Sequence, residues 1–177
     1  MMKPLMNYLD YFKKSNTAVK ANVSISWSRA ISIDELSNGT LSKANKQIAD
    51  QKNVIYLLMG ENTQGKKAID IGQTSKSLLE RTQEHLRNGD YLEKYPNNQK
   101  VYCGRISANI EIDKDLLEQV EGSIIRNVAK TAEQKGFHMC NESKVKQCEN
   151  KLIRCIKNNF IPSELRGVLR YFWINIK

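Results

Sequence analysis

The chain has 177 residues, enough for one domain with a proper hydrophobic core but hardly for two full domains. Hydrophobic residues make up 40% of it and glycine and proline are few, so the composition indicates a folded soluble protein rather than a disordered one. The 28 lysines and arginines outnumber the 19 acidic residues and leave a net charge of +9, which favours a polyanionic partner, nucleic acid before membrane.

The positive charge lies mostly outside the middle of the sequence. Residues 1–50 carry seven basic and four acidic side chains, residues 51–141 carry thirteen and twelve, and residues 142–177 carry eight and three. A nearly neutral centre with basic flanks suggests a core that performs chemistry, extended by segments that hold a polyanion.

Targeting signals and cysteine usage both bear on the cellular compartment. No apolar run approaches the ~20 residues that cross a bilayer, and the N-terminal sequence has no small-residue cleavage site, so we expect a cytoplasmic protein. Cys103, Cys140, Cys148 and Cys155 contain no CxxC pair. We interpret them as buried reduced thiols in preference to a zinc site or a disulfide framework.

The first part of the sequence predicts a helix, a strand and a second, weaker helix. Residues 4–14 place apolar side chains on one helical face, and residues 21–28 alternate between apolar and polar, the period of a half-buried strand. Ser32 and Glu35 have the spacing of a capping box, and the apolar residues within 41–48 follow helical spacing.

The centre predicts a hairpin followed by a helix. VIYLLMG (54–60) and KAIDIG (67–72) predict strands, and the short loop between them makes the two antiparallel neighbours. We expect the final glycine of the second run to end that strand. Ser77 and Glu80 then form a capping box, and the helix that they open ends near Gly89.

The remaining elements are two strands and two helices. VYCGRIS (101–107) predicts a strand, and residues 114–135 predict the strongest helix of the chain, with Gly136 as its stop. Residues 144–157 predict an amphipathic helix with its lysines mostly outward, and RYFWINI (170–176) predicts a closing strand.

Arg81 and His85 are the first candidates for chemistry. Positions four apart share one face of a helix, so the two side chains project together. Arg makes bidentate contacts with phosphate oxygens, and His exchanges a proton near neutral pH, so the pair suits a phosphodiester. The alternative is an ordinary solvated helix face.

Three more residues stand out. Tyr56 lies in the middle of the first hairpin strand, where a tyrosine usually packs with its hydroxyl satisfied. Glu121 lies next to the apolar stripe of the long helix, and carboxylates are rarely buried unless they are paired or bind a metal. Asn141 follows that helix after an extended segment, GFHM, whose His138 we interpret as structural.

In order and in rough spacing these residues resemble the GIY-YIG nuclease family. The matching motifs are VIY (54–56), DIG (70–72), the QTS turn after it, ERTQEH (80–85), VEGSII (120–125) and CNE (140–142). The resemblance covers about half of the chain. It implies an α/β (α+β) fold with a small central antiparallel sheet flanked by helices. Residues 51–142 would be the nuclease core and residues 1–50 an N-terminal elaboration that contacts the target. Residues 143–177 would pack on the core as a basic helix and strand.

The resemblance also implies a reaction and a role for each residue. The protein would be a restriction-type or mobile-element endonuclease that hydrolyses DNA with one Mg²⁺ or Mn²⁺ ion, leaving 5′-phosphate and 3′-hydroxyl ends. Tyr56 would orient or deprotonate the attacking water, His85 would help to take up its proton, Arg81 would stabilise charge on the phosphorane, Glu121 would bind the metal, and Asn141 would help to fix the site. A homodimer is plausible, because one small site cuts one strand.

Two positions depart from the family's motifs. The leading glycine of the first motif is Val54, at the start of a strand, and the tyrosine of the second motif is Asp70. Asp70 cannot act as a phenol, but it could bind the cation indirectly or hold Arg81 or a water. Two alternatives therefore remain: a DNA-binding module in which Asp70 impairs hydrolysis, and a nuclease directed at RNA.

Overall fold

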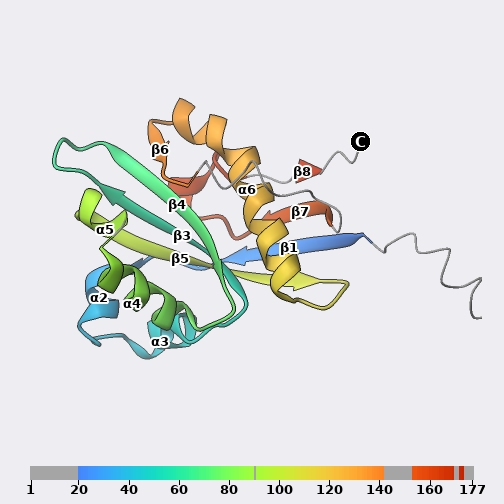
Figure 1. Ribbon diagram of the computed structural model, residues 1–177, viewed down its shortest axis with the longest axis horizontal. Coiled ribbons are helices and arrows are strands. Elements are labelled where there is room, and N and C mark those ends of the chain that lie inside the picture. Colours follow the sequence, from blue (N-terminus) through green and yellow to red (C-terminus); the bar gives the residue numbers. More distant parts are fainter. Residues whose placement is uncertain (1–19, 90, 142–152, 170–171, 174–177) are drawn as a thin grey trace, which may run out of the picture.

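The protein is built on one eight-stranded sheet with the order β6-β4-β3-β5-β1-β7-β8, with β2 paired to β5 (Figure 1). The computed structural model describes residues 20–89, 91–141, 153–169 and 172–173. The strands are β1 (Ala21–Trp27), β2 (Ile31–Ser32), β3 (Val54–Glu61), β4 (Lys67–Thr74), β5 (Asn97–Ala108), β6 (Phe137–Met139), β7 (Ile153–Asn159) and β8 (Phe172–Trp173). The helices are α2 (Ile33–Ser37), α3 (Lys43–Ala49), α4 (Leu78–Asn88), α5 (Tyr91–Lys94), α6 (Lys114–Gln134) and the 3₁₀ turn η2 (Ser163–Leu165).

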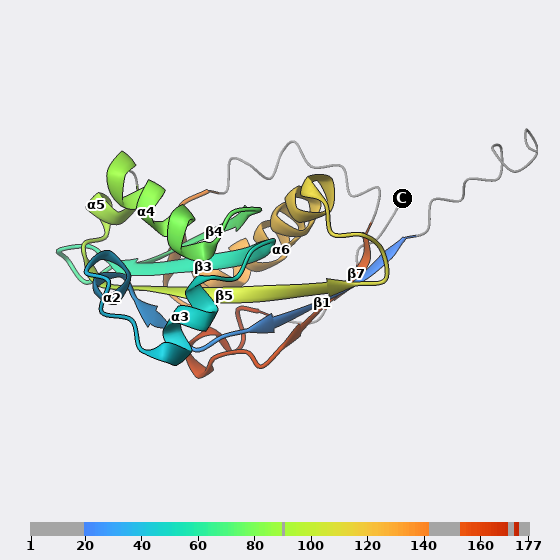
Figure 2. The same cartoon turned by 90° about the horizontal axis from the view of Figure 1, so that it is seen from below.

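Two hydrophobic clusters follow from the alternation of side chains along the central strands. In β3, Ile55 and Leu57 pack in the cluster that contains α6, β1 and β7, whereas Val54, Tyr56 and Leu58 pack in the cluster that contains α2, α3 and α4. The helices α2, α3 and α4 accordingly group together, apart from α6 (Figure 1 and Figure 2). Tyr56 therefore projects from the side of the sheet that carries α4.

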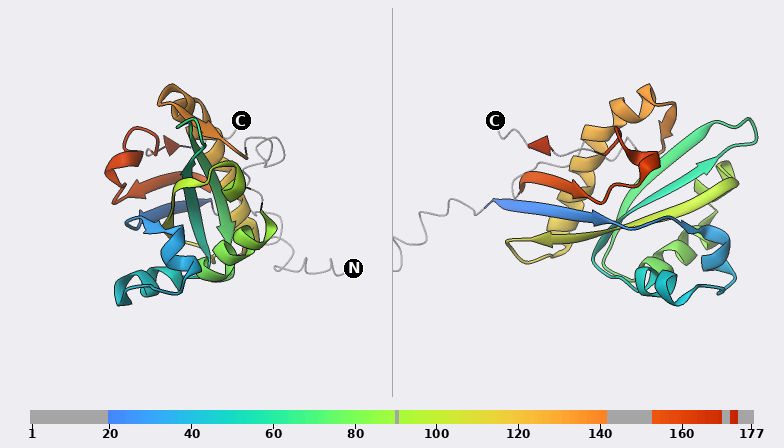
Figure 3. Two further views of the ribbon diagram at one scale, coloured as in Figure 1. Left: turned by 90° about the vertical axis from the view of Figure 1, so that its left-hand side faces the viewer. Right: turned by 180° about the vertical axis from the view of Figure 1, so that it is seen from behind.

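The expectation of a small antiparallel sheet is wrong. The strands β4, β3 and β5 are antiparallel neighbours, but β1 pairs with β7 and β4 pairs with β6 in parallel, so the sheet is mixed. Both flanks contribute strands, and within the centre of the chain β6 follows α6 and returns to the edge of β4. β1 adds to β5, and β7 adds to β1, so segments far apart in the sequence lie side by side (Figure 3).

Several local predictions are confirmed. The strand at Ala21–Trp27 alternates between buried side chains and half-buried or exposed ones, and the hairpin of β3 and β4 is antiparallel. Ser77 and Glu80 form the capping box of α4, which ends at Gly89 in the left-handed conformation. The long helix α6 is followed by Gly136, also left-handed with φ 79°. In each case the signal is local in sequence.

The weak helix expected before the hairpin consists of two short helices. Ser32 caps α2 by accepting a hydrogen bond from the Asp34 amide. Glu35 does not close the capping box but accepts a hydrogen bond from Asn45 Nδ2 at 2.6 Å, which ties α2 to α3. Gly39, with φ 68°, lies in the connection between the two helices.

The helix expected over residues 144–157 is wrong where the structure describes it. Residues Ile153–Asn159 form β7, and the part at 142–152 lies outside the described residues, as does the helix expected at 4–14. A register shift opposite Ala21 leaves Arg154 as an extra residue in the strand. The bulge places buried Ile153 and Ile156 three positions apart, a spacing that imitates a helix.

The cysteine interpretation is confirmed for two residues and wrong for one. Cys103 and Cys155 are buried, Cys140 is exposed, and Cys148 lies outside the described residues. Within the described ranges, no helix has both the length and the apolar character that a membrane span requires.

Candidate active site

A hydrogen-bonded triad forms where β3 meets α4. Tyr56 Oη lies 2.9 Å from His85 Nε2, and Arg81 Nε donates a hydrogen bond to the same Oη at 3.1 Å. The helix is held by its capping box and by buried Leu78 and Thr82. Arg81 and His85 lie next to these two residues around the helix, so the packing of this face against the sheet also turns them toward the phenol. The structure therefore brings three of the predicted site residues into direct contact.

Gly72 provides the space for the Tyr56 ring. It lies opposite Tyr56 in the register of β3 and β4, and a Cβ at this position would overlap with the phenol. The strand continues through Gly72 to Thr74, so the expectation that this glycine ends the strand is wrong. Its role is to let the backbone and the ring approach closely.

We expect Gly72→Ala to move the phenol away from Arg81 and His85 and to cost about 1–3 kcal/mol of unfolding free energy, because the added methyl group overpacks the site. Urea unfolding measures this cost. In a Tyr56→Ala background the same substitution should cost much less, since the ring is absent. An equal cost in both backgrounds would show that the glycine serves another purpose.

Glu84 fixes the orientation of Arg81. Its carboxylate lies 3.1 Å from the guanidinium and 2.5 Å from Lys76 Nζ. Hydrogen bonds from Lys76 and Arg81 lower the pKa of Glu84, so the carboxylate is charged at neutral pH. Sequence reasoning missed Glu84, although its position three residues after Arg81 on the helix is a signal for such a pair.

Two carboxylates lie within electrostatic reach of the phenol. Burial raises the pKa of Tyr56 to about 12; Arg81 opposes the rise, and the negative charges of Asp70 and Glu121 add to it. Asp70 is buried and alternates with Ala68 and Gly72 on the Tyr56 side of β4. Glu121 is half-buried on α6. Each of the other four side chains, Asp70, Arg81, His85 and Glu121, thus either contacts the Tyr56 hydroxyl or affects its ionisation.

Asn141 holds the edge of β4 beside this region. Its Nδ2 donates a hydrogen bond to the carbonyl of Ile71, the residue between Asp70 and Gly72. Its Oδ1 is buried, and within the described part of the chain it has no hydrogen-bond partner. A buried hydrogen-bond acceptor without a partner destabilises the folded state by about 1–3 kcal/mol. A ligand that donates a hydrogen bond to this oxygen, or a cation that binds it, would remove that cost. His138, in contrast, is exposed on β6 beside the ring of Tyr95.

The raised pKa of Tyr56 has a consequence for stability. A phenol that ionises at about 10 when unfolded and about 12 when folded contributes stability that is complete below pH 10 and is lost as the pH rises to 12. We expect the wild type to lose about 2–3 kcal/mol more than Tyr56→Phe over that interval, and roughly half of it by pH 11.

Urea unfolding at pH 8, 9, 10 and 11 under reducing conditions measures this difference. Burial raises the pKa of the Cys103 thiol to about 12, but that contribution is common to both proteins and cancels. If the unfolding free energies of the wild type and Tyr56→Phe changed in parallel with pH, the phenol would not be held neutral by burial in the folded protein.

No protein-family model, no curated protein and no solved structure matches this chain.

Proposed function

We propose that the chain is a metal-dependent endonuclease that hydrolyses DNA phosphodiester bonds in the manner of the GIY-YIG family. The observation that carries the proposal is the contact of Tyr56 with both Arg81 and His85, with two carboxylates in electrostatic reach. A phenol, an imidazole and a guanidinium supply proton transfer and stabilisation of negative charge, which phosphodiester hydrolysis requires.

The phenol acts by relay. With a pKa of about 12, only about one Tyr56 in 10⁵ is ionised at pH 7, so a preformed phenolate is a poor base. Tyr56 instead accepts the proton of the attacking water while its own proton passes to His85 Nε2 over 2.9 Å. The water oxygen bonds to phosphorus, the bond to the 3′ oxygen breaks, and that oxygen takes a proton from solvent water and leaves as a hydroxyl. The protonated His85 later releases its proton to solvent.

Arg81 stabilises the charge on the phosphorane. Its Nε donates a hydrogen bond to the Tyr56 hydroxyl, and its Nη1 donates one to Glu84. These two contacts orient the remaining N–H groups of the guanidinium toward the oxygens of a bound phosphate. The guanidinium stays protonated throughout, so it contributes charge and geometry but no proton.

The residues at the site fit a hard divalent cation. In the described ranges no cluster of three or more His, Cys, Asp or Glu side chains has a metal-binding arrangement, so a cation would be held by few protein ligands and by water. Glu121 is the residue that would hold it, and the orphaned Asn141 oxygen is of the ligand type that Mg²⁺ prefers. When bound, the ion would supply charge stabilisation at the scissile phosphate.

Incubation with supercoiled plasmid and Mg²⁺ or Mn²⁺ tests the proposal. We expect nicking that EDTA abolishes and products with 5′-phosphate ends, which a 5′-end labelling assay identifies. A substrate of the same sequence in RNA should be cut more slowly. Absence of any metal-dependent cleavage of DNA would overturn the proposal.

Asp70 favours a second candidate, a DNA-binding module without hydrolysis. The carboxylate occupies the position of the family's second tyrosine and lies buried beside the phenol. Its negative charge repels a phosphate. If the wild type binds DNA but cuts none, whereas Asp70→Asn or Asp70→Tyr gains cleavage, the second candidate is correct.

A further inference from the structure

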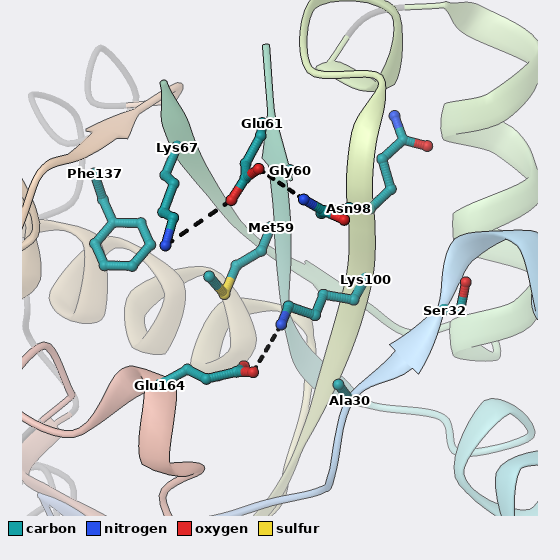
Figure 4. Close-up of a pocket in the computed structure, with 11 residues that line it drawn as sticks. Ala30, Ser32, Met59, Gly60, Glu61, Lys67, Asn98, Lys100, Phe137 and Glu164 are labelled. Atoms are coloured by element: carbon teal, nitrogen blue, oxygen red, sulfur yellow. Dashed lines mark hydrogen bonds and ion pairs between the residues drawn. The ribbon is translucent and has the colours of Figure 1, made fainter. Parts of the chain in front are cut away.

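Among the described residues, two cavities lie outside the triad and differ in the charges that line them. The first, of about 590 Å³, lies at the far end of the hairpin and is lined by Lys67, Lys100, Glu61 and Glu164 (Figure 4). Its charges are paired: Lys67 with Glu61 at 3.9 Å and Lys100 with Glu164 at 2.8 Å. The first cavity therefore offers little free charge to a ligand.

The second cavity, of about 780 Å³, lies between α3 and the strands β1 and β5; we call it the α3 groove. Its lining includes Gln47 of α3, Asp50 and Gln51 directly after that helix, Ser26 of β1, Arg105 of β5, buried Trp27, and Phe160 directly after β7 as its exposed aromatic residue. Arg105 is exposed, and in the described part of the chain no carboxylate forms an ion pair with it. The groove thus combines the guanidinium of Arg105, the carboxylate of Asp50, two side-chain amides and an exposed aromatic ring.

Both the exposure and the backbone conformation of Phe160 are unusual. Its side chain is 82% exposed, and its backbone adopts φ 53°, a left-handed conformation that is uncommon for a bulky residue. Each feature costs free energy: the ring gives up hydrophobic burial, and the backbone strain costs about 1–3 kcal/mol. Such a residue beside a groove indicates a ring kept available for a ligand.

The α3 groove and the triad share one side of the sheet. Cys103 lines the groove and lies directly opposite Tyr56 in the pairing of β3 and β5. Arg105, two residues further along β5, is a diagonal neighbour of Tyr56, and such neighbours are about 7–8 Å apart. Because successive nucleotides rise about 3.4 Å along one strand of a duplex, this separation corresponds to about two nucleotides.

We propose that the α3 groove binds an unpaired nucleotide of the substrate, about two nucleotides from the scissile phosphate. Its base stacks on Phe160, its phosphate contacts Arg105, and the amides of Gln47 and Gln51 contact the base edge. A single-stranded nucleic acid fits because its bases present free π faces to an aromatic side chain and its backbone is anionic. The inference rests on the proposed function only in taking nucleic acid as the ligand, because binding does not require cleavage.

The test uses the full chain in EDTA, so that no cleavage occurs, and a single-stranded oligonucleotide that carries 2-aminopurine. Anisotropy gives the affinity, and quenching of 2-aminopurine reports stacking. We expect Phe160→Ala to weaken binding about 5–150-fold, the equivalent of 1–3 kcal/mol per stacked base, and to relieve quenching. Phe160→Trp should preserve both. Phe160→Leu, apolar but not aromatic, should behave like alanine.

Arg105→Gln supplies the second readout. It should lower the slope of log affinity against log salt by about 0.7, as expected when one phosphate contact on a single strand is lost. Arg126→Gln, which changes an exposed arginine of α6 in the nearly neutral centre of the chain, is the matched control and should leave the slope unchanged.

The outcomes separate the two proposals. Unchanged affinity and quenching in Phe160→Ala, with plasmid nicking by the wild type intact, would overturn the inference and leave the proposed function standing. Full oligonucleotide binding by Phe160→Leu would show that an apolar side chain is enough and would overturn the stacked base. A change in the sedimentation of Phe160→Ala without a change in its oligonucleotide affinity would assign the groove to a second copy of the chain and would also overturn the inference.

Discussion

Tyr56→Phe is expected to slow DNA cleavage by about 10²–10⁴-fold, the usual contribution of a positioned proton-transfer group. The substitution removes one oxygen and retains the ring that fills the space beside Gly72. Without the hydroxyl, no proton can pass to His85 through Tyr56, and Arg81 Nε loses its hydrogen-bond acceptor. Single-turnover cleavage of a labelled duplex at saturating enzyme measures the chemical step, and a gel-shift assay in EDTA measures binding separately.

The pH dependence of the wild-type rate distinguishes relay from phenolate. A phenolate base would make the rate rise about tenfold per pH unit toward its pKa of about 12. A relay through the neutral phenol has no such rise between pH 8 and 10. If Tyr56→Phe cleaves as fast as the wild type, the phenol is a packing residue and the mechanism is wrong.

Glu121→Gln is expected to reduce metal-dependent cleavage by about 10²–10³-fold, the effect of losing a comparable electrostatic stabiliser. Glutamine keeps the size of the side chain but removes the charge that would hold a cation. DNA binding in EDTA should be equal or slightly tighter, because one negative charge has been removed from the neighbourhood of a phosphate.

Glu118→Gln is the matched control for this substitution. Glu118 lies on the same helix three residues earlier, exposed and 3.6 Å from Lys114. An exposed pair of this kind is worth about 0–1 kcal/mol at most, so cleavage should be unchanged. Equal losses of cleavage rate in the two variants would mean that α6 acts through its overall charge and that Glu121 has no specific role in cleavage.

The parts of the fold that the sequence predicts are those with local signals. Ser77 and Glu80 are three residues apart, and both hydrogen bonds of the capping box form. The hairpin depends on two adjacent strands and a short loop, and α6 on an uninterrupted apolar stripe. The same holds within the site, where the four-residue spacing of Arg81 and His85 already places both on one helical face.

The parts that the sequence does not predict depend on distant partners. The parallel pairing of β1 with β7 joins segments more than 130 residues apart, which no local pattern encodes. In β7, the bulge at Arg154 converts an alternating pattern into one with helical spacing. The contact of Gly72 with the Tyr56 ring is likewise a cross-strand event, visible only once the register is known.

Placement of a cation beside the triad is tested most directly by NMR with Mn²⁺. The chain has only two histidines, so His138 serves as an internal reference for His85. His138 pairs opposite Ala68, four residues along β4 from Gly72, which is roughly 13 Å in a strand. We expect substoichiometric Mn²⁺ to broaden the ring signals of His85 far more than those of His138, and Glu121→Gln to abolish the difference. Equal broadening of both histidines, or broadening of His85 that survives in Glu121→Gln, would contradict a metal-assisted active site at this position.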